Sequence, residues 1–233
     1  MVVFFDIGNC LYDPYQTFRR TLATLGHAEA AENLLARFGA YPDQPGRHDP
    51  WLRLCGFSRA EIEAYYHSFF HEPVFHRGSP EILDRLRARG ARLGIISDGH
   101  FDTQVGKLRA WGLSDRFDPR VVFIGSLPDD LTRTPGDYPE GVQLPLTKRR
   151  LETFHTISAR VRELYGAAPG DCWMVGDDFV RDALHPIRAG WHGVWFAAND
   201  PARRTRPAEE IPEAVPAIDD LALMEGLVCG ETR

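Results

Sequence analysis

Residues 2–11 read VVFFDIGNCL, and they indicate the kind of fold to expect. Residues 2–5 are apolar at every position, which is typical of a central parallel strand that is covered on both faces. A carboxylate and a glycine follow at once, at Asp6 and Gly8. Ligands of an open parallel sheet bind beyond the carboxyl ends of its strands. We therefore expect Asp6 to lie at the functional edge of a sheet.

Further apolar runs of strand length follow along the chain, with helical patterns between them. Strands are predicted at 93–96, 121–124, 172–175 and 194–196, and helices at 102–112, 148–165 and 179–189. Another helix has Ser79 as its N-cap and Pro80 at its first position, and it ends at Gly90. This alternation predicts βαβ units, and hence an α/β fold with a doubly wound (Rossmann-like) parallel sheet.

Residues 12–78 interrupt that alternation. They contain helical patterns around 16–26, 28–38 and 58–70, and a turn-rich stretch at 41–50. We interpret them as a small α-helical cap domain inserted into a core formed by 1–11 and 79–233. Within the core, 127–147 is rich in Pro, Gly and Asp and is predicted to be a long surface loop. From about residue 200 we expect a loosely ordered tail that ends in a short helix.

The composition narrows the function classes. The chain has 233 residues, 43% of them hydrophobic, and a net charge of -6, which is ordinary for a globular protein and argues against a nucleic-acid partner. No stretch has the roughly 20 apolar residues of a membrane span, and the start lacks the basic region of a signal peptide. The four cysteines form no CxxC motif. We expect a cytoplasmic protein without a membrane partner.

Polar groups follow several of the predicted strands. They are Asp6 and Gly8, then Ser97, Asp98 and Gly99, then Asp177 and Asp178, with Lys148 opening the helix before the fourth strand. One Asp or Gly after a strand usually makes only a turn or a cap. Carboxylates, a hydroxyl and an ammonium at so many strand ends together predict one catalytic edge.

This constellation resembles the haloacid dehalogenase superfamily, whose members are mostly Mg²⁺-dependent phosphatases. The first motif of that superfamily is similar to VVFFDIGNCL, and the second to LGIISDG, residues 93–99. The third is similar to TKRRLETF, which keeps its lysine at Lys148, and the fourth to WMVGDDFVRD, with Asp177 and Asp182. The resemblance covers residues 1 to about 200, and the order and spacing of the motifs make it specific.

The resemblance implies a role for each residue. Asp6 is the expected nucleophile, which would form an aspartyl-phosphate with the substrate, a small phosphorylated metabolite. Catalysis is assigned to Asp6, Lys148 and Ser97, and substrate binding to Ser97, Asp98, Gly99 and Lys148. The expected cofactor is Mg²⁺, and its candidate ligands are Asp6, the Gly8 carbonyl, Asp177, Asp178 and Asp182. Which of Asp178 and Asp182 completes the metal site stays open at this point, as does the oligomeric state.

The sequence departs from the superfamily pattern at Gly8. Phosphatases of the superfamily usually have a second Asp there, which protonates the leaving oxygen and then activates water. General acid–base catalysis contributes about 10²–10⁴ in rate. Its loss matters most for a simple alkoxide leaving group, and less for an anomeric or acyl oxygen. We therefore expect slow turnover, or turnover biased toward activated leaving groups.

Several alternatives remain. DIGNCL is similar to a segment of sugar-1-phosphate phosphatases and differs at one position from one in pyrimidine-nucleotide 5′-phosphatases. The 2-haloacid dehalogenases also lack the second Asp, but they use no metal and replace the acid kept here at Asp177. Phosphonoacetaldehyde hydrolases need a lysine in the cap, and 12–78 contains none. A non-catalytic binding module is the runner-up.

Overall fold

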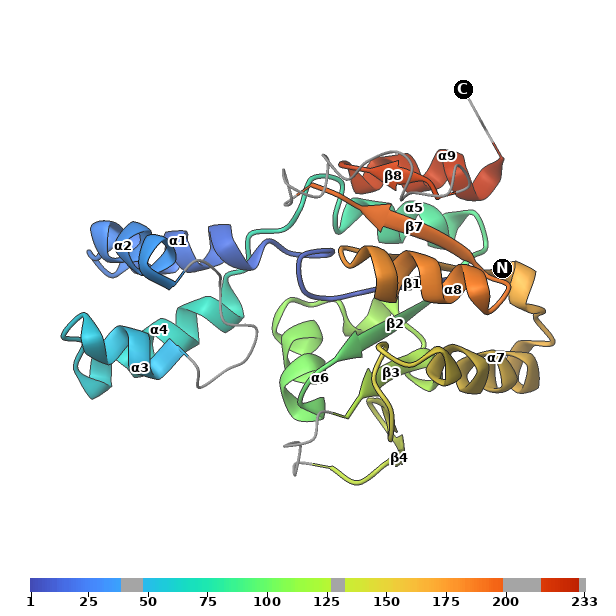
Figure 1. Ribbon diagram of the computed structural model, residues 1–233, viewed down its shortest axis with the longest axis horizontal. Helices are drawn as coiled ribbons and strands as arrows, with labels where there is room; N and C mark the ends of the chain where they lie inside the picture. Colours follow the sequence, from blue (N-terminus) through green and yellow to red (C-terminus); the bar gives the residue numbers. More distant parts are fainter. Residues whose placement is uncertain (39–47, 127–132, 199–214, 231–233) are drawn as a thin grey trace.

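The computed structural model describes residues 1–38, 48–126, 133–198 and 215–230. Within them one eight-stranded sheet runs in the order β4-β5-β3-β2-β1-β6-β7-β8 (Figure 1). The strands are β1 (Val2–Phe5), β2 (Arg92–Asp98), β3 (Val122–Gly125), β4 (Gly136–Tyr138), β5 (Gly141–Leu144), β6 (Cys172–Gly176), β7 (His192–Phe196) and β8 (Ala217–Ile218). All neighbours pair in parallel except β4 and β5. The doubly wound parallel sheet is confirmed, with an antiparallel strand at one edge.

Strand β1 is buried on both faces. Val3 and Phe5 belong to the hydrophobic cluster that includes α5 (Glu81–Ala88), α6 (Phe101–Ala110) and α9 (Met224–Cys229). Val2 and Phe4 point to the opposite face and pack in the cluster of α7 (Leu151–Tyr165). This alternation explains why all four residues of the strand are apolar. The described residues also contain short 3₁₀ turns: η1 (Ser114–Arg116), η2 (Pro119–Val121), η3 (Pro169–Asp171) and η7 (Leu221–Leu223).

Four helices lie between β1 and α5 in the chain and stand to one side of the sheet (blue to cyan in Figure 1). They are α1 (Pro14–Thr24), α2 (Ala28–Phe38), α3 (His48–Leu54) and α4 (Arg59–His71). Asp13 caps α1 by accepting a hydrogen bond from the Gln16 backbone N–H at 2.9 Å. Ser58 and Glu61 form a capping box at the start of α4. Local sequence signals therefore set where these two helices begin.

The aromatic residues of α4 divide into a buried and an exposed set. Tyr65 and Phe69 are buried, and the Tyr65 hydroxyl lies 2.7 Å from Nδ1 of His48. Phe70 is half-buried against the same cluster, so these three residues form part of the packed interior of the helical region. His67 and His71 are exposed, and their rings stack with centroids 4.7 Å apart. Among the described residues, no helix is long and apolar enough to span a bilayer.

The predicted surface loop at 127–147 is wrong in its second half. Strands β4 and β5 form a hairpin there, and β5 is buried beside β3. A Cβ at Gly141 would lie 2.8 Å from the carbonyl oxygen of Val122, so glycine allows the close approach of the two strands. The strands are too short for a period-2 pattern to stand out among turn-forming residues. The first part, 127–132, lies outside the described residues.

Several predicted helix bounds also need correction. Helix α5 begins at Glu81 with Pro80 at the cap position, so Ser79 is not its N-cap. Lys148 does not open a helix, since α7 starts at Leu151. The predicted helix at 179–189 is a π-helical turn, η4 (Phe179–Leu184), followed by α8 (His185–Arg188). Residues 48–50 of the predicted turn-rich stretch at 41–50 belong to α3, and residues 41–47 lie outside the described residues. The short helix predicted at the end of the chain is confirmed by α9.

Candidate active site

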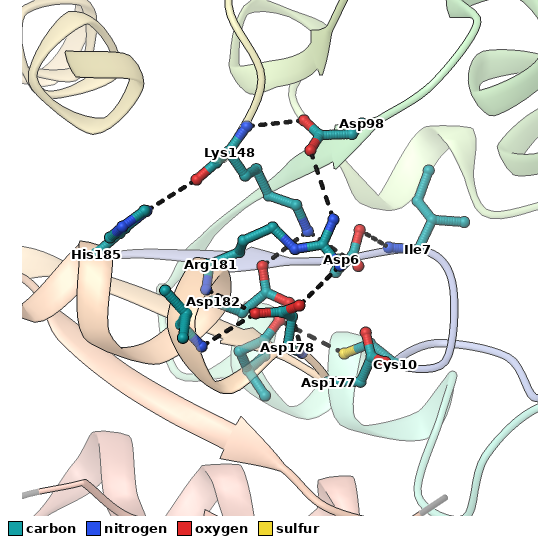
Figure 2. A network of polar contacts seen from close by, with 12 residues as sticks. Asp6, Ile7, Cys10, Asp98, Lys148, Asp177, Asp178, Arg181, Asp182 and His185 are labelled. Atoms are coloured by element: carbon teal, nitrogen blue, oxygen red, sulfur yellow. Dashed lines mark hydrogen bonds and ion pairs between the residues drawn. The ribbon is translucent and has the colours of Figure 1, made fainter. Parts of the chain in front are cut away.

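Three carboxylates converge at the carboxyl edge of the sheet. Asp6 directly follows β1, Asp177 directly follows β6, and Asp182 lies in η4 (Figure 2). One oxygen of each lies within 4.8 Å of an oxygen of the other two. Strands β1 and β6 are parallel neighbours, which places the first two side by side. An all-oxygen donor set of this kind fits a hard divalent cation such as Mg²⁺.

Lys148 provides the buried cation of this site. Its Nζ lies 2.7 Å from Oδ1 of Asp182 and 3.0 Å from Oδ2 of Asp6. Burial acts to lower the pKa of the ammonium, but the carboxylates of Asp182, Asp6 and Asp98 outweigh it and raise the pKa above its ordinary value. Lys148 is therefore positively charged at neutral pH. Its backbone carbonyl lies 3.0 Å from Nδ1 of His185, which ties the lysine to the start of α8.

The π-helical turn η4 decides how Asp182 faces the site. The carboxylate of Asp182 is fully buried, and its Oδ2 accepts a hydrogen bond from the Asp178 backbone N–H at 3.0 Å. It folds back against Gly176, where a Cβ would lie 2.3 Å from the same oxygen. Glycine at the end of β6 therefore makes room for the acid. Burial raises the pKa of Asp182, although Lys148 opposes the shift.

We expect Gly176→Ala to lower the free energy of unfolding by about 1–3 kcal/mol, because the added methyl group overpacks the Asp182 carboxylate. Urea denaturation in EDTA measures the loss. Gly170→Ala is the matched control, since no atom lies within 4 Å of the Cβ position at Gly170. Equal stability of the two variants would contradict this description of η4.

Asp178 has a different role from its two acidic neighbours. Its Oδ1 accepts hydrogen bonds from the backbone N–H groups of Val180 at 3.0 Å and Arg181 at 2.9 Å. It therefore caps η4, as an Asp commonly does at the start of a helical turn. Its other oxygen, Oδ2, lies 2.8 Å from Nη2 of Arg181. Of the two acids left open by the sequence, Asp182 joins the group of three carboxylates and Asp178 does not.

The residues at the carboxyl end of β2 line the same edge. Ser97 is buried, and Oδ1 of Asp98 accepts a hydrogen bond from the Lys148 backbone N–H at 2.8 Å. Gly99 has a φ of 144°, and its N–H donates to the carbonyl of Gly125 at 3.2 Å. Because this N–H is already hydrogen-bonded at the edge of the sheet, the role of Gly99 is to adopt the backbone conformation that the turn requires. Burial raises the pKa of Asp98.

Gly8 stands in open space beside Asp6. Apart from its two neighbours in the chain, no heavy atom of the described residues lies within 4 Å of the position that a Cβ would take at Gly8. The Asp6 carboxylate is oriented by the Ile7 backbone N–H, which donates to its Oδ1 at 2.8 Å. The site therefore has room for a larger residue at position 8.

Two residues of the site were missed by the sequence reasoning. Cys10 is buried below the carboxylates, and its thiol donates to the Val175 carbonyl at 3.5 Å; burial raises the pKa of this thiol. Arg181 reaches from η4 across the site toward Asp98 (Figure 2). Its position next to Asp182, within the fourth motif, was the available signal.

Comparisons with known proteins identify the family of this chain and a similar protein. Residues 1–190 match the family described as haloacid dehalogenase-like hydrolase. A glyceraldehyde 3-phosphate phosphatase of Pyrococcus abyssi is 26% identical over 219 residues, which cover 84% of this chain and 80% of the relative.

Solved structures share the fold. A phosphatase of the same superfamily from Thermococcus onnurineus has a TM-score of 0.56 at 22% identity, and 98% of each chain is covered. The Bacillus subtilis hydrolase YfnB, solved with magnesium bound, has a TM-score of 0.59 at 17% identity, and 97% of each chain is covered. These two structural matches show a shared fold, whereas the match over residues 1–190 shows the family.

Proposed function

The chain belongs to the haloacid dehalogenase-like hydrolases, and from this premise we propose that it is a Mg²⁺-dependent phosphatase that hydrolyses a small phosphorylated metabolite through an aspartyl-phosphate on Asp6. The observation that carries the proposal is the group formed by Asp6, Asp177, Asp182 and Lys148 at one sheet edge, in which all but the half-buried Asp177 are buried. A nucleophilic carboxylate, further acids for a cation and a fixed ammonium are the groups that phosphoryl transfer needs.

In the proposed reaction, a carboxylate oxygen of Asp6 attacks phosphorus, and the bond from phosphorus to the leaving oxygen breaks. The leaving oxygen takes up a proton, and water then hydrolyses the aspartyl-phosphate to release inorganic phosphate and restore Asp6. Lys148 holds the Asp6 carboxylate in place and offsets negative charge on the phosphoryl group. Bound Mg²⁺, held by Asp6, the Gly8 carbonyl, Asp177 and Asp182, supplies Lewis-acid stabilisation of that charge. Ser97 is assigned to the phosphoryl oxygens.

The helices of 12–78 are proposed to act as a cap over this site. The chain enters them at Tyr12 and leaves them at Phe75, and these two residues pair in an antiparallel bridge. The Trp111 indole N–H, at the end of α6, donates to the carbonyl of Phe70 in α4 at 2.8 Å. The two segments that connect the helices to the sheet therefore lie side by side. Such a narrow connection suits a cap that opens for substrate and closes for chemistry.

The substrate class follows from the site and from the relative. A net charge of -6 disfavours nucleic acid. A phosphorylated three-carbon compound such as glyceraldehyde 3-phosphate is the first candidate, because a phosphatase of that compound is 26% identical. Its leaving group is a simple alkoxide, so we expect its turnover to be slow with Gly8 in the site. We also propose a cytoplasmic location, where the four free thiols stay reduced.

The test is phosphate release from a panel with Mg²⁺ and with EDTA. The panel includes glyceraldehyde 3-phosphate, sugar 1-phosphates, sugar 6-phosphates, nucleotides and acetyl phosphate. We expect release that EDTA abolishes and that favours a small compound. If no compound is turned over while inorganic phosphate still binds with Mg²⁺, the chain is a non-catalytic binding protein and the proposal fails.

We expect Gly8→Asp to increase kcat for sugar 6-phosphates and other alkoxide leaving groups by about 10²-fold, the lower end of what general acid–base catalysis contributes. Apart from the two neighbours in the chain, no described atom lies within 4 Å of the Cβ position at Gly8, and Gly8 lies outside the left-handed region of φ. Phosphate release measures the gain. Gly8→Asn has nearly the same size without the acid, and an equal gain there would refute the general-acid explanation.

A further inference from the structure

Asp98 presents an electrostatic difficulty in the segment assigned to phosphate binding. It directly follows Ser97, and its carboxylate is confined, with Oδ1 accepting from the Lys148 backbone N–H at 2.8 Å. The same oxygen would lie 2.5 Å from a Cβ at Gly125, so glycine there leaves it room. The other oxygen, Oδ2, is buried and accepts no hydrogen bond in the described part of the chain. A fixed anion beside the expected phosphoryl position repels the substrate.

Arg181 is the side chain that approaches this unsatisfied oxygen. Its Nη1 lies 4.0 Å from Oδ2 of Asp98, and its Nη2 lies 2.8 Å from Oδ2 of Asp178. Figure 2 shows the guanidinium between these two carboxylates, one at the end of β2 and one after β6. The Arg181 side chain is 33% exposed, so it borders the open side of the site. It joins the ends of two strands that β1 separates in the sheet.

The charge balance of the site depends on this arginine. Among the residues labelled in Figure 2, five are carboxylates (Asp6, Asp98, Asp177, Asp178 and Asp182), and the permanent cations are Lys148 and Arg181. Lys148 is engaged by Asp6 and Asp182. Lys148 also lowers the pKa of Asp98, but among the described residues Arg181 is the cation that forms an ion pair with this carboxylate, at 4.0 Å. Burial acts to lower the pKa of the guanidinium, but Asp178, Asp182 and Asp6 raise it, and the group stays charged.

Resting on the proposed phosphatase function, we propose that Arg181 is a positioning residue that neutralises Asp98, so that a phosphoryl group can bind beside an acidic strand end. The effect is electrostatic and acts through Asp98. A purely structural role is disfavoured, because Asp178 caps η4 through the backbone N–H groups of Val180 and Arg181, which remain when the side chain is replaced.

The test is a double-mutant cycle between Arg181→Gln and Asp98→Asn, with inorganic phosphate as the probe. Calorimetry in the presence of Mg²⁺ gives the dissociation constant, and the substrate panel gives kcat and KM. We expect Arg181→Gln to weaken phosphate binding about tenfold, which corresponds to about 1.4 kcal/mol. The loss should fall on KM more than on kcat. Arg181→Lys, which keeps the charge, should recover most of the affinity.

The decisive comparison is the effect of Asp98→Asn in the two backgrounds. We expect it to raise the phosphate affinity of Arg181→Gln about tenfold, nearly to that of the wild-type protein, and to have a clearly smaller effect in the wild-type background, because coupled residues are not additive. The same factor in both backgrounds would overturn the proposal, and so would an Arg181→Gln variant with unchanged affinity. Arg120→Gln, which breaks an ion pair of 2.7 Å with Asp118 outside the site, is the matched control and should leave phosphate binding unchanged.

This design separates the inference from the proposed function. If inorganic phosphate binds and the cycle shows coupling while no compound is turned over, Arg181 keeps its role and the phosphatase proposal fails. If turnover is found without coupling between Arg181 and Asp98, the phosphatase proposal stands and this inference fails. If the wild-type protein binds no phosphate in Mg²⁺, both fail.

Discussion

Replacing Asp6 with Asn is expected to reduce phosphate release by at least about 10⁴-fold, since loss of a covalent nucleophile removes most of the catalysed rate. The amide cannot attack phosphorus to form the acyl phosphate. Its size and its carbonyl oxygen preserve the hydrogen bond that the Ile7 N–H donates at 2.8 Å. The fold should therefore be retained. Phosphate release in Mg²⁺ measures the rate, and circular dichroism checks the fold.

Asp102→Asn is the matched control for that loss. Asp102 is an acid of the first turn of α6, with an exposed side chain that pairs with Arg133 at 3.0 Å. We expect its replacement to leave kcat within about twofold of wild type, as for most surface changes. An Asp6→Asn variant that keeps a tenth or more of the wild-type rate would refute the role of Asp6 as nucleophile.

Replacing Lys148 with Met is expected to produce the largest loss of stability. Both carboxylates that Lys148 contacts, Asp6 and Asp182, are buried, and removing their shared cation leaves them uncompensated. Breaking a buried pair in this way costs about 3–5 kcal/mol. Urea denaturation in EDTA should show that decrease. Added Mg²⁺ should restore more stability to the variant than to the wild type, because a cation then replaces the lost charge among the acids.

The other lysine of the sequence gives a matched comparison. Lys107 is also buried, but its Nζ lies 3.2 Å from the hydroxyl of Tyr12, and within the described ranges it forms no ion pair with a carboxylate. Lys107→Met should therefore cost less stability and leave the response to Mg²⁺ unchanged. If the two variants respond equally to Mg²⁺, the stabilisation does not come from the acidic group beside Lys148.

The central part of the sheet could be predicted from the sequence because burial on both faces leaves a local signature. Four consecutive apolar residues at 2–5 are typical of a strand that is covered on both faces. The helical patterns that follow this run and the similar runs along the chain support that interpretation. The polar residues at the ends of these strands could be identified because they directly follow the apolar runs. Strands β4 and β5 left no such signature, since they have only three and four residues, β4 is largely exposed, and β5 owes its burial to β3.

The roles of other site residues depend on the tertiary structure. Asp178 and Asp182 are both acids within one motif, and only the π-helical turn η4 directs Asp182 toward Lys148 and leaves Asp178 as a cap. Arg181 faces Asp98 although 83 positions separate them in the sequence, because β1 brings the ends of β2 and β6 to one edge. Periodicity and motifs report local preferences and the order of strands. The direction of one side chain, and the charge it meets, depend on how distant segments pack.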